Sequence, residues 1–440
     1  MIKIAFMGAG STVFAKNVLG DCIMTPALEG MEIWLYDIDP VRLEDSKRML
    51  SNILKNSGRK DTSIHATLDR TAALAGAGYV VNAIQVGGYE PCTVTDFEIP
   101  KKYGLRQTIA DTLGIGGIFR ALRTIPVMMD FAEDMRRLCP DALFINYTNP
   151  MAMLSGYIQQ NTDIRTIGLC HSVQGCVPTL LKDVGLFEQY DGKTRWEIAG
   201  INHQAWLLKV TDLEGNDLYP EIKKRSRDLE LADLRKKDLV RLEMMNRFGY
   251  YITESSEHFS EYCPWFIKAR NPELIDRFNI PLDEYPRRCV KQIDQWVAMR
   301  ESLVNDENLE HKKSKEYAAY IIEAMETDKP FRVHGNVQNT GHLITNLPEN
   351  ACVEVPCMID RNGVNPCHVG ALPEQCAAIN RTNINVQLLT IEAARTLKKE
   401  YVYMAAMMDP HTAAELTMDE ITSMCDDLFE AHKDWMPEYK

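Results

Sequence analysis

Short apolar runs alternate with amphipathic stretches through the first 200 residues of the chain. Apolar runs of four to six residues, bounded by turn residues, are typical of buried strands, whereas a period near 3.6 is typical of helices. We expect strands at 2–7, 31–36, 79–84, 142–145 and 164–169, and helices at 15–24, 41–57 and 68–78. This alternation predicts an α/β fold with a Rossmann-type parallel sheet.

The second half of the chain has a different pattern. Residues 220–330 are charged with helical periodicity, and residues 331–360 contain short β-like runs broken by Gly and Asn. A helix is expected over 382–408, a break at Asp409-Pro410, and a final helix after residue 415. We therefore predict a Rossmann domain at 1–195, followed by an α+β domain at 196–440 that binds substrate and forms oligomer contacts.

Composition narrows the possible partners and the compartment. The net charge of −13 argues against nucleic acid or an anionic membrane as a partner. The sequence begins in Ile2–Phe6, which we expect to be a strand, and we expect neither a targeting segment nor a stretch long enough to span a bilayer. Its 12 cysteines are scattered without a CxxC pair, so we expect reduced thiols in a cytoplasmic protein.

A glycine turn between the first strand and the first helix points to a dinucleotide. Gly8 suits the tight turn, Gly10 allows close approach of a pyrophosphate, and Ser11 stands at the start of a helix. The third glycine of the usual fingerprint is absent, so the motif alone also fits a simple turn. Asp37 ends the second strand, where a carboxylate binds the adenosine ribose of NAD and repels the 2′-phosphate of NADP. Asp39, followed by Pro40, is expected to cap the next helix.

Several polar side chains are expected at the carboxyl ends of these strands, where ligands bind in open α/β sheets. Gln85 follows the third strand listed above and would lie beside the cofactor, and Asn149 follows the strand at 142–145. The glycine-rich segment 110–117 is expected to be a loop, either closing over a ligand or serving only as a connector. Asp111 is its only ionisable residue.

Cysteine and histidine also stand at strand ends. Cys170 and His171 follow the run at 164–169, and His203 follows the short strand at 196–198. A thiolate and an imidazole with open positions suit a divalent ion that acts as a Lewis acid. A Cys/His nucleophile pair is the alternative.

Taken together, the motifs Gly8–Ser11, Asp111–Gly114, Asn149-Pro150, Cys170–Ser172 and Gly200–His203 resemble those of glycoside hydrolase family 4. The resemblance covers nearly the whole chain. The run Cys-His-Ser-Val from Cys170 is similar to the α-galactosidase branch of that family.

The resemblance implies a fold like that of lactate and malate dehydrogenases, with bound NAD and Mn²⁺. It also implies a glycosidase outside the two-carboxylate scheme. C3 of the sugar would be oxidised transiently, C2 deprotonated, the aglycone eliminated and water added before re-reduction. The net reaction would be hydrolysis, and relatives of this kind form dimers or tetramers.

Roles follow residue by residue from the same resemblance. Cys170 and His203 would bind the metal, and Tyr262 would be the base. His171, where some relatives carry an aspartate, would protonate the leaving group or bind a sugar hydroxyl. Asn149, Asp111, Arg287 and Arg288 would contact the sugar.

The choice of sugar is less constrained. Pro91-Cys92 stands where phosphoglycosidase members tend to carry an arginine, which favours an unphosphorylated α-galactoside such as melibiose. An α-glucosidase or α-galacturonidase of the same family is the alternative, and the glycine motifs alone also fit a net NAD-dependent dehydrogenase or a non-catalytic NAD sensor.

Overall fold

The computed structural model describes residues 2–229, 238–314 and 316–440. Within these residues the strands form one sheet in the order β3-β2-β1-β4-β5-β6-β10-β11-β7-β8-β9, with β12 paired to β11. The first six strands are parallel. They are β1 (Lys3–Met7), β2 (Glu32–Tyr36), β3 (Ser63–Thr67), β4 (Tyr79–Asn82), β5 (Leu143–Asn146) and β6 (Thr166–Gly168).

The order 3-2-1-4-5-6 is that of the Rossmann fold, so the predicted fold class is confirmed. Every residue of β4 and β5 is buried, as expected for parallel strands covered by helices on both faces. The predicted strands are present with slightly different bounds. Strand β3 was not predicted, because its sequence Ser-Ile-His-Ala-Thr is half-buried throughout and has no apolar run.

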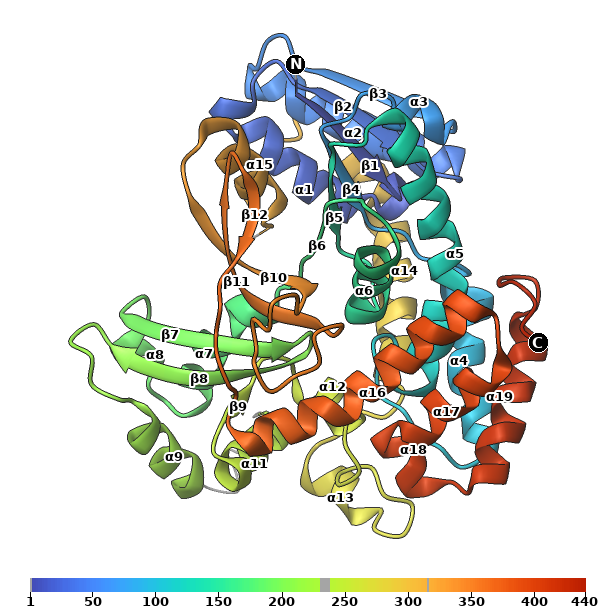
Figure 1. Cartoon of the computed structure of the whole chain (residues 1–440). Coiled ribbons are helices and arrows are strands. Elements are labelled where there is room, and N and C mark those ends of the chain that lie inside the picture. The colour runs from blue at the N-terminus through green and yellow to red at the C-terminus, as the bar shows by residue number, and fades with distance from the viewer. Residues whose placement is uncertain (1, 230–237, 315) are drawn as a thin grey trace.

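Helices cover both faces of this parallel half (Figure 1). Their bounds are η1 (Ala9–Ser11), α1 (Val13–Met24), η2 (Pro26–Leu28), α2 (Pro40–Ser57), α3 (Arg70–Leu74), η3 (Gly88–Thr93), α4 (Val94–Lys102), α5 (Gly114–Leu138) and α6 (Met151–Asn161). Helix α2 begins as predicted. Asp39 Oδ1 accepts hydrogen bonds from the amides of Val41 and Arg42, at 2.9 and 3.1 Å, and Pro40 occupies the first turn.

The prediction of a loop over 110–117 was wrong at its carboxyl end, because helix α5 already begins at Gly114. The glycines serve packing inside this helix. A Cβ atom on Gly116 would lie 2.5 Å from the carbonyl oxygen of Ala110, and one on Gly117 would lie 2.7 Å from the carbonyl carbon of Thr112. The preceding turn therefore lies directly against the first turns of α5.

The sheet continues into an antiparallel half. Strand β10 pairs with β6 through Asn336 and Gly168, and β11 pairs with β7 through Glu354 and Gly200. Figure 1 shows β10 and β11 between β6 and the β7–β8 hairpin. The strands are β7 (Thr194–Ile201), β8 (Gln204–Asp212), β9 (Tyr251–Ile252), β10 (Phe331–Gln338), β11 (Cys352–Asp360) and β12 (Gly363–Pro366).

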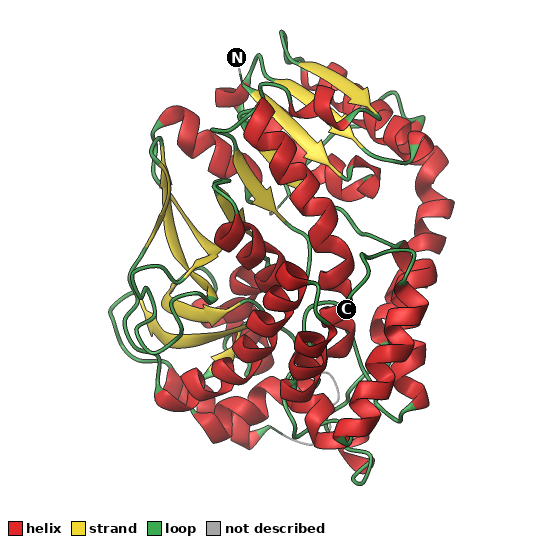
Figure 2. Cartoon of the chain, turned by 45° about the vertical axis from the view of Figure 1, so that its right-hand side comes forward, coloured by secondary structure: helices red, strands yellow, loops and turns green. Residues whose placement is uncertain are grey.

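In Figure 2 the antiparallel strands lie at the left, and helices fill the lower and right-hand parts of the view. The helices of this second half extend well beyond those strands. They are α7 (Ser172–Asp183), α8 (Phe187–Tyr190), α9 (Tyr219–Asp228), α11 (Leu239–Phe248), α12 (Ser256–Ser260), α13 (Glu273–Arg277), α14 (Glu284–Val304), α15 (Ala318–Thr327), α16 (Glu374–Thr396), α17 (Lys399–Met408), α18 (Pro410–Glu415) and α19 (Met418–His432).

The helix predicted over 382–408 is two helices, because Leu397 adopts a left-handed conformation (φ 55°) that ends α16. The break at Asp409-Pro410 is confirmed, and Asp409 caps α18. The strand-rich character of 331–360 is confirmed as well. A division of the chain at residue 195 stays a prediction, since one sheet runs through both parts. Across the described ranges, no helix combines the length and apolarity that crossing a bilayer requires.

Candidate active site

A cradle for a dinucleotide forms where β1 passes into α1. Gly8 has φ 89°, and a Cβ atom there would lie 2.6 Å from the carbonyl oxygen of Ala83. The amide of Gly10 donates to Asp37 Oδ2 at 2.6 Å, so the glycine turn and the end of β2 are in contact. Ser11 Oγ is buried without a hydrogen-bond partner in the described structure. A phosphate oxygen at this helix start would satisfy it, so these residues fit NAD.

The end of β4 forms the neighbouring wall. Gln85 Nε2 donates to Thr93 Oγ1 at 3.4 Å. The carbonyl oxygen of Val86 accepts from Arg123 Nε at 3.2 Å. Arg123 also donates two hydrogen bonds to Asp96, at 3.1 and 2.6 Å, and His432 Nε2 lies 2.9 Å from the same carboxylate. Three buried side chains from α4, α5 and α19 thus hold the strand end that carries Gln85.

The structure brings Cys170 and His203 together and adds Glu254. Cys170 follows β6, His203 lies in the two-residue turn of the β7–β8 hairpin, and Glu254 follows β9. One ligand atom from each lies within 4.8 Å of the other two. His203 has φ 62°, a conformation that non-glycine residues rarely adopt and that is often found at functional sites.

These three side chains perturb one another electrostatically. Burial raises the pKa of Cys170, but the facing His203 outweighs it, and the net pKa is lowered. Burial lowers the pKa of His203, but the charges of Cys170 and Glu254 raise it by more, and the net pKa is about 10. Burial also opposes ionisation of Glu254, yet His258 and His203 lower its pKa to about 2. The cluster therefore concentrates negative charge around one imidazole.

This donor set fits a divalent transition-metal ion. Two ligand atoms on opposite sides of such an ion, each about 2.0–2.3 Å from it, lie at most about 4.6 Å apart. All the ligand atoms of the cluster lie within 4.8 Å of one another, and His203 Nε2 is 3.5 Å from Glu254 Oε2, so the three side chains are close enough to share one ion. Sulfur, nitrogen and carboxylate oxygen together suit ions from Mn²⁺ to Zn²⁺ better than Ca²⁺ or Mg²⁺, which prefer oxygen alone.

Tyr262 lies beside the metal cluster. Its hydroxyl is 3.2 Å from His203 Nδ1, and the side chain is fully buried. Burial, followed by the carboxylates of Asp111 and Glu261, raises the pKa of Tyr262 well above 10. A phenol in this environment ionises near neutral pH only if a cation is close, which is what the neighbouring cluster is suited to bind.

Asp111 reaches this place through a short backbone segment held by one carboxylate. Glu261 accepts hydrogen bonds from the amides of Thr108 and Ala110, both at 2.8 Å, and from Ile109 at 3.2 Å. Burial nevertheless raises the pKa of Glu261 to about 7. Asp111 itself is nearly buried and accepts from Thr112 Oγ1 at 2.7 Å. Glu261 thus fixes the residues just before Asp111.

His171 is adjacent to Cys170, but its ring turns to other partners. Its Nε2 lies 2.8 Å from Glu316 Oε2. The ring lies nearly parallel to those of Tyr147 and Tyr317, with centroid distances of 6.2 and 5.8 Å. Its side chain is 47% exposed, compared with 11% for Glu316. One face of the site therefore offers an accessible imidazole.

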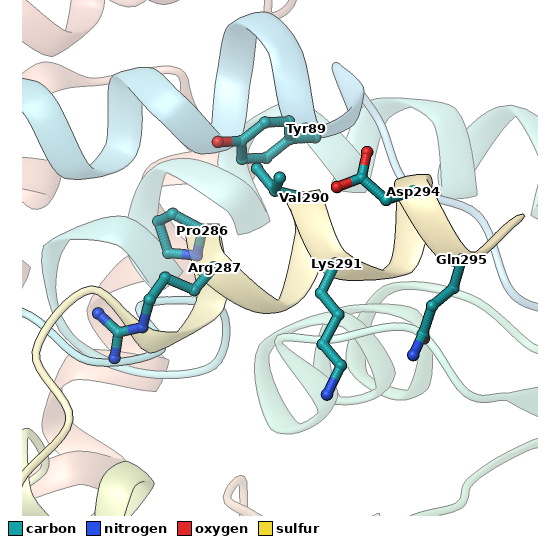
Figure 3. A pocket seen from close by; sticks show the side chains of 7 residues that line it. All are labelled: Tyr89, Pro286, Arg287, Val290, Lys291, Asp294 and Gln295. Carbon is teal, nitrogen blue, oxygen red and sulfur yellow. The ribbon is translucent and has the colours of Figure 1, made fainter. Parts of the chain in front are cut away.

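The remaining predicted substrate residues lie in different surroundings. Asn149 Oδ1 accepts from the amide of Met151 at 3.2 Å at the start of α6. Arg288 pairs with Glu257 and Glu284, and Arg287 pairs with Glu284. Arg287 also lines a surface groove of about 630 Å³ along α14 (Figure 3). None of the described residues lining that groove belongs to the metal cluster.

Three glutamates were not identified as site residues from the sequence. Glu254 stands four residues before His258, and its Oε1 lies 3.7 Å from His258 Nδ1. This i,i+4 pair of possible metal ligands was the feature of the sequence that could have identified Glu254. Glu261 and Glu316 gave none, since their partners lie 153 and 145 residues away in the chain.

Comparisons with known proteins agree with this geometry. Residues 3–186 match the model of the family 4 glycosyl hydrolases, and residues 198–412 match the C-terminal domain of the same family. The chain is 62% identical to an α-galactosidase of Bacillus subtilis (strain 168) over 440 residues, which is the full length of both. It is 35% identical to an α-galactosidase of Rhizobium meliloti (strain 1021), covering 99% of this chain and 89% of the relative.

A solved structure shares the fold. It is a 6-phospho-β-glucosidase from Thermotoga maritima, crystallised with manganese, NAD⁺ and glucose 6-phosphate. The TM-score is 0.78 at 20% identity, and the match covers 99% of each chain.

Proposed function

The chain belongs to the family 4 glycosyl hydrolases, and from this membership we propose that it is an NAD- and Mn²⁺-dependent α-galactosidase that hydrolyses α-galactosides such as melibiose. The observation that carries the proposal is the 62% identity to the Bacillus subtilis α-galactosidase over the entire length of both chains. The match extends over the segments that carry the cofactor cradle, the metal cluster and the helices of the second half.

Two bound groups would supply chemistry that side chains lack. When bound, NAD at Gly8, Gly10, Ser11, Asp37 and Gln85 supplies a hydride acceptor for C3 of the sugar, and a divalent ion at Cys170, His203 and Glu254 supplies a Lewis acid for the sugar oxygens. The donor set of the cluster and the unpartnered hydroxyl of Ser11 support these assignments.

The proton transfers fall to this chain's own side chains. Tyr262 is the base for the C2 hydrogen, supported by its place 3.2 Å from His203. His171 is the proton donor to the departing oxygen, supported by its accessible ring next to Cys170. Asn149 and Asp111 orient the sugar. Arg287 and Arg288 are assigned the same role. Arg288 pairs with Glu257, the residue before His258, and its charge acts on that histidine.

The same proposal extends to the roles of the two parts of the chain, its oligomeric state and its cellular compartment. Residues 1–195 bind NAD and contribute Asp111, Asn149 and His171 to the sugar site, and residues 196–440 complete that site and form a homodimer or homotetramer. The exposed apolar side chains of Val290, Ile293 and Val297 on α14 support such assembly. All 12 cysteines are free, which supports a reducing compartment such as the cytoplasm.

The experiment that tests this function is hydrolysis of 4-nitrophenyl α-galactoside by protein stripped of metal and nucleotide, with NAD⁺, Mn²⁺ and a thiol reductant added back. We expect activity only when both cofactors are present. Full activity of the stripped protein would refute the proposal that catalysis depends on NAD and a metal ion. Faster hydrolysis of the α-glucoside or α-galacturonide would transfer the assignment to those specificities.

Two further measurements distinguish the reaction type. After turnover in D₂O, the galactose formed should carry deuterium at C2, because Tyr262 exchanges this hydrogen with solvent. Product without deuterium at C2 would refute the elimination route. Stoichiometric accumulation of NADH would instead identify a net dehydrogenase.

A further inference from the structure

The imidazole of His171 contacts three residues distant in sequence. Glu316 Oε2 lies 2.8 Å from Nε2, and the rings of Tyr147 and Tyr317 lie nearly parallel to the imidazole, at interplanar angles of 25° and 18° and centroid distances of 6.2 and 5.8 Å. The contact with Glu316 sets the direction in which Nε2 points, and the two aromatic rings limit how far the imidazole can turn. The contact with Glu316 engages one ring nitrogen and leaves Nδ1 as the other polar atom of the ring.

Glu316 belongs to a segment that is itself fastened to the cofactor half. This segment, which we call the strap, comprises residues 305–314 and 316–317. Near its start, Asn52 Nδ2 donates to the carbonyl oxygen of Asp306 at 2.9 Å, and Asn56 Nδ2 donates to those of Glu307 and Leu309 at 2.9 and 3.0 Å. Helix α2 therefore holds the first part of the strap.

A buried carboxylate on α1 holds the last part of the strap. Asp21 accepts from the amide of Ser314 at 2.7 Å and from its hydroxyl at 2.5 Å, and His311 Nε2 lies 2.7 Å from the same carboxylate. The His311 ring packs so closely on α1 that a Cβ atom on Gly20 would lie 2.7 Å from it. Asp21 is fully buried, so these contacts are shielded from water.

The same contacts extend to the imidazole. Ser314 Oγ accepts from the amide of Glu316 at 3.1 Å, and Tyr147 OH accepts from the amide of Ala318 at 3.1 Å. The amides of Glu316 and Ala318 are thus each hydrogen-bonded to a side-chain oxygen, and these two contacts support the position of the carboxylate that meets His171. A side chain merely paired on the surface would not need this support.

We propose that Glu316 is the positioning residue of His171 in the α-galactosidase reaction, a proposal that rests on the function stated above. By accepting from Nε2–H, Glu316 fixes the orientation of the ring and directs Nδ1 toward the glycosidic oxygen. Before this step the ring carries protons on both nitrogens; the Nδ1–H bond breaks as that oxygen leaves C1 and gains the proton, and the ring becomes the neutral Nε2–H form. The ring regains a proton from the water that adds to the sugar, while Nε2–H stays with Glu316.

The test uses two substrates that differ in leaving group. Melibiose releases a sugar that needs a proton, whereas 4-nitrophenyl α-galactoside releases a phenolate that leaves without one. For the Glu316→Ala holoenzyme we expect kcat on melibiose to fall about 100-fold, within the usual range for a general acid, with less than about a 5-fold fall on the nitrophenyl substrate. KM should change less than about 3-fold on either.

Two other variants separate positioning from general damage. Glu316→Gln keeps an oxygen that accepts from Nε2–H and should recover most of the melibiose activity. Glu323→Gln, which removes a similar charge further along on α15, should behave as wild type on both substrates. Equal losses on the two substrates, or no loss, in Glu316→Ala would overturn the proposal.

A second readout does not depend on turnover. In protein labelled with ¹⁵N-histidine, the His171 signal, assigned by its absence in His171→Gln, should show the neutral ring as the Nε2–H tautomer in wild type and in Glu316→Gln, with Nδ1 protonated as well only in the cationic ring that donates the proton. In Glu316→Ala it should show both tautomers, and an unchanged signal there would also refute the proposal. If wild type with both cofactors cleaves neither galactoside, the proposed function fails by itself, and this signal still decides the role of Glu316.

Discussion

Replacing Arg123 by methionine removes the guanidinium that neutralises Asp96 inside the protein. The side chains of Arg123 and Asp96 are 0% and 2% exposed, so water cannot take over the lost contacts. The Arg123→Met variant would leave a buried carboxylate with His432 as its remaining side-chain partner, at 2.9 Å. It would also leave the carbonyl oxygen of Val86 without its donor.

The expected cost follows from this geometry. Breaking a buried ion pair by removing one partner typically costs about 3–5 kcal/mol. We expect the lower part of that range, about 3 kcal/mol, because His432 continues to donate to Asp96. An unfolding entropy of about 2.1 cal/mol/K per residue gives about 0.9 kcal/mol per degree for a chain of this length, so Tm should fall by about 3 °C.

The assay is calorimetry at one fixed scan rate on protein free of metal and nucleotide, because bound ligands would raise Tm by mass action. Two controls bracket the result. Arg247→Met breaks the exposed pair with Glu243 and should leave Tm unchanged, and Asp96→Leu combined with Arg123→Met should recover at least half of the loss. A Tm of Arg123→Met within 1 °C of wild type would refute the reasoning.

Three further results are expected. Burial raises the pKa of Glu261 from 4.5 to about 7, so between these pH values the folded protein keeps a proton that the unfolded chain has lost. The stability of the wild type, compared with Glu261→Gln, should therefore fall as the pH rises from 4.5 to 7. A Tm difference that moves the opposite way in paired melts at pH 5 and pH 8 would mean that the three amides dominate. Cys170→Ser should lose tight Mn²⁺ binding, measured by metal analysis after dialysis, and with it the add-back activity; retention of stoichiometric Mn²⁺ would exclude Cys170 as a ligand. Gly8→Ala should cost at least about 1–2 kcal/mol and weaken NAD binding, measured by calorimetric titration, whereas Gly58→Ala, also at positive φ but in open space, should leave NAD binding intact.

Most of the fold could be predicted from local pattern. The apolar runs that became β1, β4 and β5 are buried on both faces, and those of β2 and β6 are at least partly buried throughout, so each could be recognised from its own sequence. The helix cap at Asp39 is equally local. Strand β3 was missed because neighbouring strands, rather than its own composition, stabilise it.

The residues of the candidate site also differ in whether the local sequence reveals them. Cys170 and His203 were identifiable because each follows a strand that the sequence itself reveals. Glu316 reaches His171 only because a strap is fastened to α1 and α2, and Glu261 reaches its three amides only across the folded core. Such contacts depend on the relative placement of elements, which a single sequence does not encode locally.

The junction between the two halves of the sheet has a consequence for how the protein responds to damage. Cys170 follows the last parallel strand and His203 lies in the antiparallel hairpin, with β10 and β11 between them. An ion bound to both is a reversible cross-link, and its binding energy adds to the folding free energy of both halves together. Oxidation of the single sulfur of Cys170 would therefore remove more than activity. It would lower the resistance of the whole chain to unfolding, so a protein that has lost its metal would also be degraded more readily by proteases.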